Sequence, residues 1–383
     1  MLSENVNSED ERPLSFRLVS DKHSPSFKNN MTNRIAVEFK NVSKDFDEVK
    51  AVRDLNFSIE SGQLVTLLGP SGCGKTTTLR LIAGLEMVTE GRVYIGGKDV
   101  TTLPATDRDV SMVFQSYALF PHMNVLQNVS YGLTMSRFPK IEVKRKALAG
   151  LELVGLAEFG ERLPSELSGG QQQRVAVARA LVLEPEVLLF DEPLSNLDAK
   201  LRRRVREEIR ELQQKLELTT IYVTHDQEEA LAVSDRIIVM NEAVIAQEGT
   251  PRQLYEEPVS LFVSDFIGDA NLVKSTILEI DGSDAKVDIA GIGTQLPHRG
   301  LTSGDANVAI RPQSICLSES GTEGGIPGTI LKASYLGDHM EYTVDCALGE
   351  LFVIDYQMET LQDSGSSVYI TFLTRGVSLV PES

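Results

Sequence analysis

The stretch Leu64-Val-Thr-Leu-Leu68, followed at once by Gly69-Pro-Ser-Gly-Cys-Gly-Lys75-Thr76, decides the fold. The first five residues predict a buried β-strand, and a helical pattern follows over Lys75–Ala83. Between them lies the pattern G-x-x-x-x-G-K-[ST], whose glycines let backbone N–H groups curl around phosphate at the positive end of a helix. A glycine-rich turn with an unrelated lysine is the plain alternative, and the strand-loop-helix context favours phosphate binding.

We expect this loop to bind the phosphates of ATP, with Lys75 on the β- and γ-phosphates and the Thr76 hydroxyl on Mg²⁺. Cys73 is either a small residue that fits the loop or a thiol activated near the helix N-terminus. The residues predicted to contact the nucleotide here are Gly69, Pro70, Ser71, Gly72, Cys73, Gly74, Lys75, Thr76 and Thr77.

Short apolar runs alternate with helical patterns along the chain. The predicted strands are Ile35–Phe39, Leu64–Leu68, Val110–Phe114, Val187–Phe190, Ile221–Thr224 and Ile237–Met240. The predicted helices are Lys75–Ala83, Lys140–Val154, Gly170–Leu183 and Ala199–Leu216. Buried strands that alternate with helices indicate an α/β fold with a mostly parallel sheet.

Several strand ends carry residues suited to hydrolysis. Asp191 and Glu192 follow the apolar run Val187–Phe190, and we expect Asp191 to hold Mg²⁺ through water and Glu192 to deprotonate the attacking water. An acidic turn is the alternative for this pair. Gln115 ends another strand, with its amide oxygen available to Mg²⁺ or to the water. His225 ends a third strand and is predicted near the γ-phosphate, although a histidine there often serves packing or capping.

A second glycine-rich turn, Leu167-Ser168-Gly169-Gly170-Gln171, opens another predicted helix. Its backbone N–H groups lie at a positive helix end, which favours an anion. Because one chain needs a single cradle for its own ATP, the second turn implies the phosphate of a nucleotide held by a partner.

In order and spacing, these motifs resemble the nucleotide-binding domain of ABC transporters over about residues 34–260. The resemblance implies a P-loop NTPase fold with a RecA-like core over residues 33–266 and a helical subdomain at about 116–185. It also implies a homodimer with the two copies head to tail. Residues Ser168–Gln171 of one copy would close over the ATP of the other.

Two more nucleotide contacts follow from the same resemblance. Asp198 ends the segment Ser195–Asp198, which resembles the link between the two sites of the dimer. Phe46 aligns with the aromatic residue that stacks on adenine. One departure is Asn241-Glu-Ala243, where glycine is usual at the third position, because alanine resists a positive φ.

The resemblance also gives a role to the uncharged run Ser111–Ser136. Within it, a groove is expected to receive a coupling helix of a transmembrane permease. The groove residues are Tyr117, Leu119, Phe120, Pro121 and His122. A substrate-binding protein would be an indirect partner, and the chain is expected to lie peripherally on the cytoplasmic face of the membrane.

The C-terminal region, residues 267–383, alternates short strands with glycine-rich turns and predicts an all-β domain. The predicted strands are Lys274–Ile280, Ala285–Ile289, Val308–Ile310, Gly328–Tyr335, Met340–Val344 and Val368–Phe372. The segments Ile310-Arg-Pro312 and Tyr335-Leu-Gly-Asp338 resemble the OB-like, transport-associated (TOBE) domain of importers. Such a domain stabilises the dimer or senses a regulator.

The cargo is less well defined by the sequence. The segments Gln171–Arg174, Val187–Phe190, Ala232–Asp235 and Gly268–Leu272 look closest to ferric-iron (Fe³⁺) importer ATPases. Importers of polyamines, sugars and 2-aminoethylphosphonate share most of these motifs. A regulatory ATP-binding protein without a transport role is the alternative from another class.

Composition excludes several classes of protein. The net charge of the 383 residues is −18, which argues against nucleic acid as a partner and against electrostatic docking on anionic lipid. Three scattered cysteines suggest neither a disulfide framework nor a zinc site. Residues 1–32 predict a disordered tail, and Met31 is an alternative candidate for the first residue.

The basic segment Leu201–Ile209 is predicted to be a solvated helix face. At the i,i+4 spacing, Arg203 is expected to pair with Glu207 and Arg204 with Glu208. The segment therefore does not indicate a basic binding surface.

Overall fold

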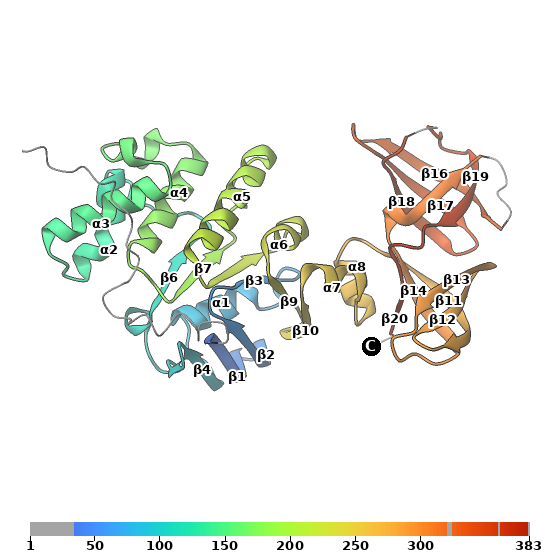
Figure 1. Ribbon diagram of the computed structural model, residues 1–383, viewed down its shortest axis with the longest axis horizontal. Helices are drawn as coiled ribbons and strands as arrows, with labels where there is room; N and C mark the ends of the chain where they lie inside the picture. The colour runs from blue at the N-terminus through green and yellow to red at the C-terminus, as the bar shows by residue number, and fades with distance from the viewer. Residues whose placement is uncertain (1–33, 320–323, 359–360, 382–383) are drawn as a thin grey trace, which may run out of the picture.

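The computed structural model describes residues 34–319, 324–358 and 361–381. An α/β part is joined through two short helices, α7 (Pro251–Glu256) and α8 (Leu261–Phe266), to an all-β part (Figure 1). The predicted tail over residues 1–32, with Met31, lies outside the described residues.

A six-stranded sheet with the order β10-β9-β3-β8-β7-β6 forms the centre of the α/β part. Its strands are β3 (Leu64–Leu68), β6 (Val110–Val113), β7 (Val187–Asp191), β8 (Thr220–Thr224), β9 (Arg236–Asn241) and β10 (Val244–Gly249). All but β10 run parallel, so the prediction of a mostly parallel sheet is confirmed. Parallel strands bring their carboxyl ends to one edge, and β3, β8, β7 and β6 are direct neighbours there.

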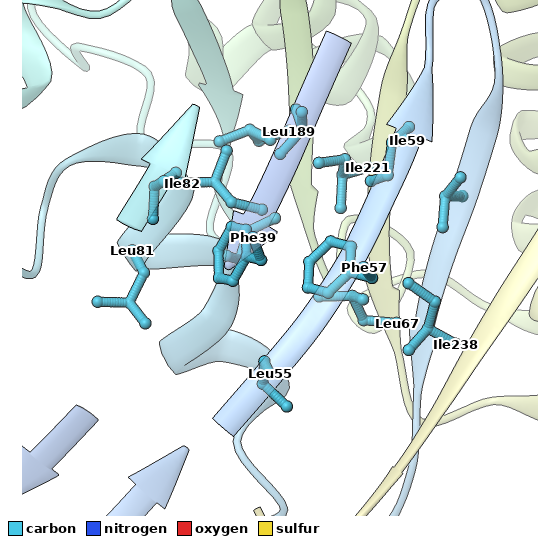
Figure 2. Close-up of a cluster of buried hydrophobic side chains, with 14 of the residues drawn as sticks. Phe39, Leu55, Phe57, Ile59, Leu67, Leu81, Ile82, Leu189, Ile221 and Ile238 are labelled. Atoms are coloured by element: carbon cyan, nitrogen blue, oxygen red, sulfur yellow. The ribbon is translucent and has the colours of Figure 1, made fainter. Parts of the chain in front are cut away.

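A second, antiparallel sheet has the order β2-β1-β4-β5. Its strands are β1 (Ile35–Phe46), β2 (Val49–Glu60), β4 (Glu90–Ile95) and β5 (Lys98–Asp99). The predicted strand Ile35–Phe39 therefore extends further than expected and belongs to this sheet. Phe39 and Phe57 stack at 4.5 Å between the two sheets, in one core with Leu67, Leu189 and Ile221 (Figure 2).

Six helices complete the α/β part. They are α1 (Lys75–Ala83), α2 (Val125–Met135), α3 (Lys140–Leu153), α4 (Gly169–Leu181), α5 (Ala199–Leu216) and α6 (Gln227–Val233). Helices α2, α3 and α4 pack around their own apolar core, which includes Val129, Leu151 and Val175. Helix α2 lies in the uncharged run and begins with a capping box between Asn124 and Gln127.

The segment before α2 contains the predicted permease groove. Pro121 and His122 are exposed, whereas Leu119 and Phe120 are partly buried. Tyr117 is only 6% exposed and belongs to the core, so it contributes no open surface to a groove.

The all-β part consists of two five-stranded antiparallel sheets around one shared core. One sheet contains β11 (Asn271–Asp281), β12 (Asp284–Ile289), β13 (Ile292–Pro297), β14 (Gly304–Ile310) and β20 (Val377–Val380). The other contains β15 (Ile315–Ser318), β16 (Ile326–Tyr335), β17 (Met340–Cys346), β18 (Gly349–Asp355) and β19 (Ser367–Phe372).

Arg311 joins the two parts of the molecule. It is 2% exposed, and its guanidinium donates to the backbone oxygens of Tyr255 at 2.5 Å and Ser264 at 2.8 Å, and to that of Ile267. The guanidinium also lies 4.2 Å from the centre of the Tyr255 ring. Burial lowers the pKa of Arg311. Backbone carbonyls thus hold a buried cation between α7, α8 and the β-sheets, and the nearby carboxylate of Asp269 partly opposes the lowering of the Arg311 pKa.

Candidate functional site

The glycine-rich loop between β3 and α1 packs too tightly for side chains at two positions. A Cβ on Gly69 would lie 2.3 Å from the Met240 oxygen, and a Cβ on Gly74 would lie 2.5 Å from the Ala51 oxygen. Gly74 is also the N-cap of α1, with φ 103° and no side-chain cap. The backbone of this loop therefore packs closely against neighbouring strands. At Gly69 the space alone requires glycine, and at Gly74 both the space and the positive φ require it.

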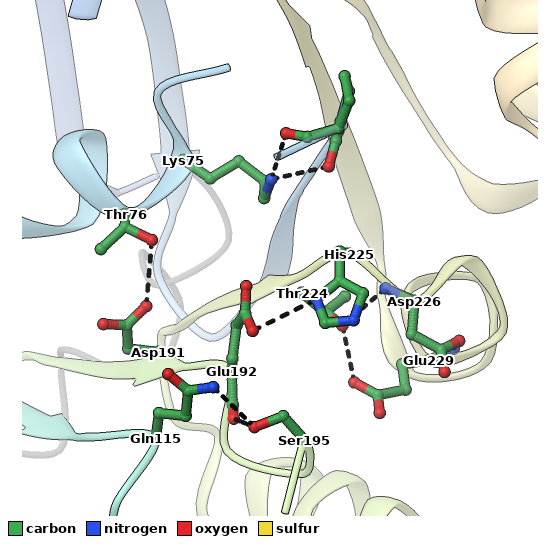
Figure 3. Close-up of polar contacts among 12 residues, drawn as sticks. Lys75, Thr76, Gln115, Asp191, Glu192, Ser195, Thr224, His225, Asp226 and Glu229 are labelled. Atoms are coloured by element: carbon green, nitrogen blue, oxygen red, sulfur yellow. Dashed lines mark hydrogen bonds and ion pairs between the residues drawn. The ribbon is translucent and has the colours of Figure 1, made fainter. Parts of the chain in front are cut away.

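Lys75 lies inside the loop with 5% exposure. Its Nζ donates to the backbone oxygens of Gly69 at 2.7 Å and Pro70 at 2.8 Å and lies 3.7 Å from the Cys73 Sγ (Figure 3). Cys73 is itself 3% exposed. The ammonium group is thus held by the loop's own carbonyls, where a phosphate would compete for it.

Thr76, in the first turn of α1, meets the end of β7. Its Oγ1 donates to the Asp191 Oδ1 at 3.4 Å. Burial raises the pKa of Asp191, and Arg80 partly opposes this. Among the described residues, no salt bridge neutralises Asp191. A hydroxyl beside a half-buried carboxylate is an oxygen donor set that fits Mg²⁺.

Glu192 and His225 face each other from the ends of β7 and β8. The distance between Glu192 Oε2 and His225 Nδ1 is 3.3 Å (Figure 3). Glu192 adopts φ 45°, and its backbone N–H donates to the Val223 oxygen at 3.0 Å. A left-handed conformation is costly for a non-glycine residue and is typical of functional sites. The Glu192 side chain points toward His225 (Figure 3).

Gln115, which follows β6, is held at the same site by Ser195 and Asn196. The sequence did not reveal this role of the two residues. The Nε2 of Gln115 donates to the Ser195 Oγ at 3.1 Å, and its backbone oxygen accepts from the Asn196 Nδ2 at 3.0 Å. Ser195 Oγ in turn donates to the backbone oxygen of Glu192 at 3.0 Å. Ser195 therefore links Gln115 to the backbone of Glu192. The hydrogen bond between Gln115 and Ser195 spans 80 residues, and no local pattern indicates it.

A buried carboxylate behind His225 was also missed. Glu229 is 3% exposed and accepts from Thr224 Oγ1 at 2.9 Å and Tyr222 Oη at 3.0 Å. Burial raises the pKa of Glu229. Because Thr224 Oγ1 also accepts from the backbone N–H of Asp226 at 3.0 Å, this cluster fixes the chain on both sides of His225.

Among the described residues, no hydrogen bond or salt bridge joins the predicted residues Ser168, Gln171, Asp198 and Phe46 to this site. Ser168 is the N-cap of α4 and forms a capping box with Gln171, and Asp198 caps α5. Phe46 is 42% exposed at the end of β1, with Lys44 Nζ 4.5 Å from its ring centre. In the part of the chain that the structure describes, no hydrogen bond or salt bridge joins Ser168–Gln171 to the phosphate loop.

Comparison with known protein families agrees with this geometry. The family model described as "ABC transporter" matches residues 52–195, and that described as "TOBE domain" matches residues 308–380. A "Fe(3+) ions import ATP-binding protein" of Rhizobium etli is 59% identical over 344 residues, or 90% of this chain and 97% of its own. The protein of the same description in Escherichia coli K12 is 47% identical over 354 residues, or 92% of this chain and 100% of its own.

Two solved structures share the fold of the α/β part. The cbiO1 protein of Clostridium perfringens, part of an ABC transporter complex, superposes with a TM-score of 0.55 at 27% identity, over 59% of this chain and 92% of its own. A dimeric ATP-binding cassette in a post-hydrolysis state with ADP and Pi gives a TM-score of 0.50 at 34% identity, over 56% of this chain and 99% of its own.

The fold, the site and these matches define an ABC-type transport ATPase. More narrowly, the chain belongs to the family of import ATP-binding proteins that join such an ATPase to a TOBE domain. The sequence-based predictions of the P-loop ATPase fold, of the OB-like C-terminal domain and of ATP hydrolysis are confirmed. None of the described helices is both long and apolar enough to cross a membrane.

Proposed function

We propose that two copies of this chain bind head to tail around ATP and power the uptake of Fe³⁺ through a separate permease. The main support is that one copy gathers the Lys75, Asp191, Glu192 and His225 side chains, whereas among the described residues no hydrogen bond or salt bridge joins Ser168–Gln171 to them. A complete site then needs a second copy. The similar cassette with bound ADP and Pi is a dimer, and the relatives described above are named for Fe³⁺ import.

Hydrolysis would use the residues at the strand ends. Lys75 exchanges the loop carbonyls for the β- and γ-phosphates, whose charge makes stronger hydrogen bonds. Mg²⁺ would be held by Thr76, Asp191 and Gln115 and would offset the phosphate charge. Glu192 accepts the proton of the attacking water, and His225, whose side chain is 59% exposed, orients Glu192 and faces the γ-phosphate.

The residues outside this cluster would act across the dimer. Ser168–Gln171 would contact the γ-phosphate held by the partner subunit, and Asp198 would join the two sites. Phe46, exposed at the end of β1, would stack on adenine.

The permease would dock on the segment before α2, where Leu119, Phe120, Pro121 and His122 leave apolar and aromatic surface at least partly open. In this arrangement the chain would lie on the cytoplasmic face of the membrane. A substrate-binding protein would deliver the cargo to the permease from the other side.

Replacing the proposed base tests the mechanism. Glu192→Gln keeps the shape of the side chain but cannot accept a proton, so turnover should fall by roughly 10²–10⁴-fold while ATP binding persists. ATP should also drive the variant into stable dimers, measured by light scattering after gel filtration. The matched control is Glu152→Gln on the exposed face of α3, which should hydrolyse ATP as the parent does.

Uptake assays in cells that lack the native subunit test the identity of the cargo separately from the mechanism of hydrolysis. Uptake of radioactive Fe³⁺ should return with the parent chain and with Glu152→Gln, and should not return with Glu192→Gln. Near-parental hydrolysis by Glu192→Gln would overturn the mechanism. If the chain restored uptake of a polyamine or a sugar but not of Fe³⁺, the assignment of Fe³⁺ as the cargo would be wrong, and the proposed mechanism of hydrolysis would stand.

A further inference from the structure

The start of α3 and the turn before it carry an excess of positive charge. Between Met135 and Leu148 there are five cations and one acid, in a chain whose net charge is −18. The cations are Arg137, Lys140, Lys144, Arg145 and Lys146, and the acid is Glu142.

Most of these cations have no acidic partner. Lys146 is paired, with its Nζ 2.6 Å from the Glu184 Oε1. The other four are exposed, and within the described part of the chain none of them forms a salt bridge. Four charges on one short stretch are thus available to a partner.

Exposed apolar side chains lie among the unpaired cations. The exposed fractions are 87% for Ile141, 61% for Met135, 39% for Leu148 and 37% for Phe138. An apolar side chain that is almost wholly in water gains by burial against another surface. We refer to these four residues and the four unpaired cations together as the α3 patch.

The α3 patch follows the geometry of one helix face. On α3, Ile141 is followed by Lys144, Arg145 and Leu148, at the spacing i, i+3, i+4 and i+7. The opposite side of the helix, which includes Leu151, packs in the core shared with α2 and α4. The patch is therefore the outer surface of a packed helix rather than a frayed end.

The basic segment of α5 is different, because acids are interspersed with its cations. Arg203 pairs with Glu207 at 3.2 Å, as predicted. The predicted pair of Arg204 with Glu208 is not formed, because Glu208 faces Arg174 of α4, 3.8 Å away. Helix α5 is described throughout, and none of its large apolar side chains is exposed. The α3 patch thus differs from this solvated face both in its unpaired cations and in its exposed apolar groups.

The mixture of cations and apolar groups indicates a lipid surface with negative headgroups. Such a surface attracts Lys and Arg and also takes apolar side chains between its headgroups. Nucleic acid would use the cations through its phosphates but has no comparable place for Ile141. Lysine is depleted in protein–protein interfaces, which disfavours an acidic protein as the partner.

The negative net charge of the chain does not oppose this contact. At physiological ionic strength, exposed charges are largely screened beyond about 8 Å. The helix rises about 12 Å from Lys140 to Leu148, so the charges of the patch and its close neighbours dominate the field at a headgroup. Electrostatic docking through α3 is therefore compatible with a net charge of −18.

We propose that the α3 patch binds the anionic surface of the membrane, with Ile141 among the headgroups and Lys140, Lys144 and Arg145 at the phosphates. Leu119, in the segment proposed to receive the permease, packs against the same core as α3. The lipid contact would hold the helical subdomain beside the proposed permease contact. It rests on the proposed location at the membrane, but not on the cargo or on the hydrolytic base.

The test uses the full-length chain without nucleotide, sedimented with vesicles of phosphatidylcholine that either are pure or contain one third phosphatidylglycerol. The parent chain should bind the anionic vesicles about tenfold or more tightly than the neutral ones, and salt should weaken this binding. The double variant Lys140→Glu with Lys144→Glu should bind them about tenfold or more weakly. Ile141→Gln, which removes only the apolar group, should weaken binding by about tenfold.

The double variant Lys286→Glu with Lys332→Glu is the matched control, because both lysines are exposed in the all-β part and the net charge changes equally. It should bind anionic vesicles as the parent does. All these variants should hydrolyse ATP as the parent does, which separates a lost lipid contact from a lost fold.

Three results would overturn the proposal: equal binding of the parent to both kinds of vesicle, binding to neither, or equal losses in the two double variants. Binding only to vesicles that contain the permease would also overturn it, in favour of a protein partner for the α3 patch. Vesicles without permease keep the test independent of the proposed cargo and mechanism of hydrolysis.

Discussion

Two helices in this chain begin at glycine-rich turns, and their first residues are built in opposite ways. The turn before α1 ends in Gly74 at φ 103°, and no side chain caps the helix. The turn before α4 ends in Ser168 with extended backbone, and Ser168 and Gln171 cap the helix reciprocally. In sequence the two turns look alike, because each places small residues before a helix.

The two helix N-termini also differ in the groups that surround them. The N-terminus of α1 has a lysine, a hydroxyl and a carboxylate beside it in the same chain, namely Lys75, Thr76 and Asp191. The N-terminus of α4 is exposed at Ser168, and within the described part of the chain no cation or acid forms a hydrogen bond or salt bridge with Ser168. Backbone conformation, rather than glycine content, therefore distinguishes the two turns, and the exposed second turn is the one proposed to meet another copy.

The largest effect on ATP binding should come from Gly74→Ala. A Cβ here meets the Ala51 oxygen at 2.5 Å and a backbone at φ 103°, so the loop must move. We expect ATP binding to weaken by about tenfold to a hundredfold, as strain of about 1–3 kcal/mol implies. Titration with a fluorescent ATP analogue measures this, and circular dichroism checks the fold.

Gly169→Ala, in the first turn of α4, is the matched control for this comparison. Its Cβ would lie 3.2 Å from the tip of the Leu197 side chain, which can yield, and the backbone is helical. The monomer should bind ATP normally. If both alanine variants lost ATP equally, the two turns would not differ as described.

Asp191→Asn tests the acid that completes the first cradle. Without its charge, the gain in ATP affinity that Mg²⁺ provides should fall by about tenfold. For the free energy of unfolding without Mg²⁺, we expect a gain rather than a loss in the variant. Because burial raises the pKa of Asp191, the native carboxyl favours the folded state below its ordinary pKa and loses that contribution as pH rises through the raised value.

The variant should therefore be more stable than the native chain at neutral pH without Mg²⁺, and the difference should vanish in acid. Urea unfolding at several pH values measures it. A native chain that is more stable than Asp191→Asn at neutral pH would mean that an internal cation already pairs with the carboxylate.

Ser168→Ala probes the second turn. Loss of the cap should cost about 1 kcal/mol of unfolding free energy. ATP binding by the monomer should stay unchanged, while ATP-driven dimerisation weakens, measured by analytical ultracentrifugation. Weaker ATP binding by the isolated monomer would contradict the assignment of this turn to the partner's nucleotide.

Sequence reasoning located the first cradle because its residues are contiguous or end strands of one parallel sheet. It missed β2 and β4, whose polar residues break the apolar patterns that predicted the central strands. It also missed Ser195 as the link between Gln115 and Glu192, and it paired Glu208 with Arg204 rather than with Arg174. Such pairings depend on which elements pack together, and this is not visible in local spacing.

The smallest effect should come from Ala243→Gly, which reverses the chemistry of Gly74→Ala. The Asn241-Glu-Ala243 turn forms despite the missing glycine, with φ 46° at Glu242 and 68° at Ala243. It joins β9 to β10, and its strand β9 carries the Met240 oxygen that packs against Gly69. The turn therefore lies next to the strand that packs against the phosphate loop, and it places an alanine in the left-handed region.

Relief of that conformation contributes about 1–2 kcal/mol, whereas the buried methyl group that is lost is worth about 0.8 kcal/mol. We expect Ala243→Gly to raise the unfolding free energy by at most about 1 kcal/mol, measured in urea, with ATP affinity unchanged. A loss of stability would show that packing of the methyl outweighs the backbone. The loss expected for Gly74→Ala would then be assigned to the 2.5 Å contact with the Ala51 oxygen rather than to positive φ.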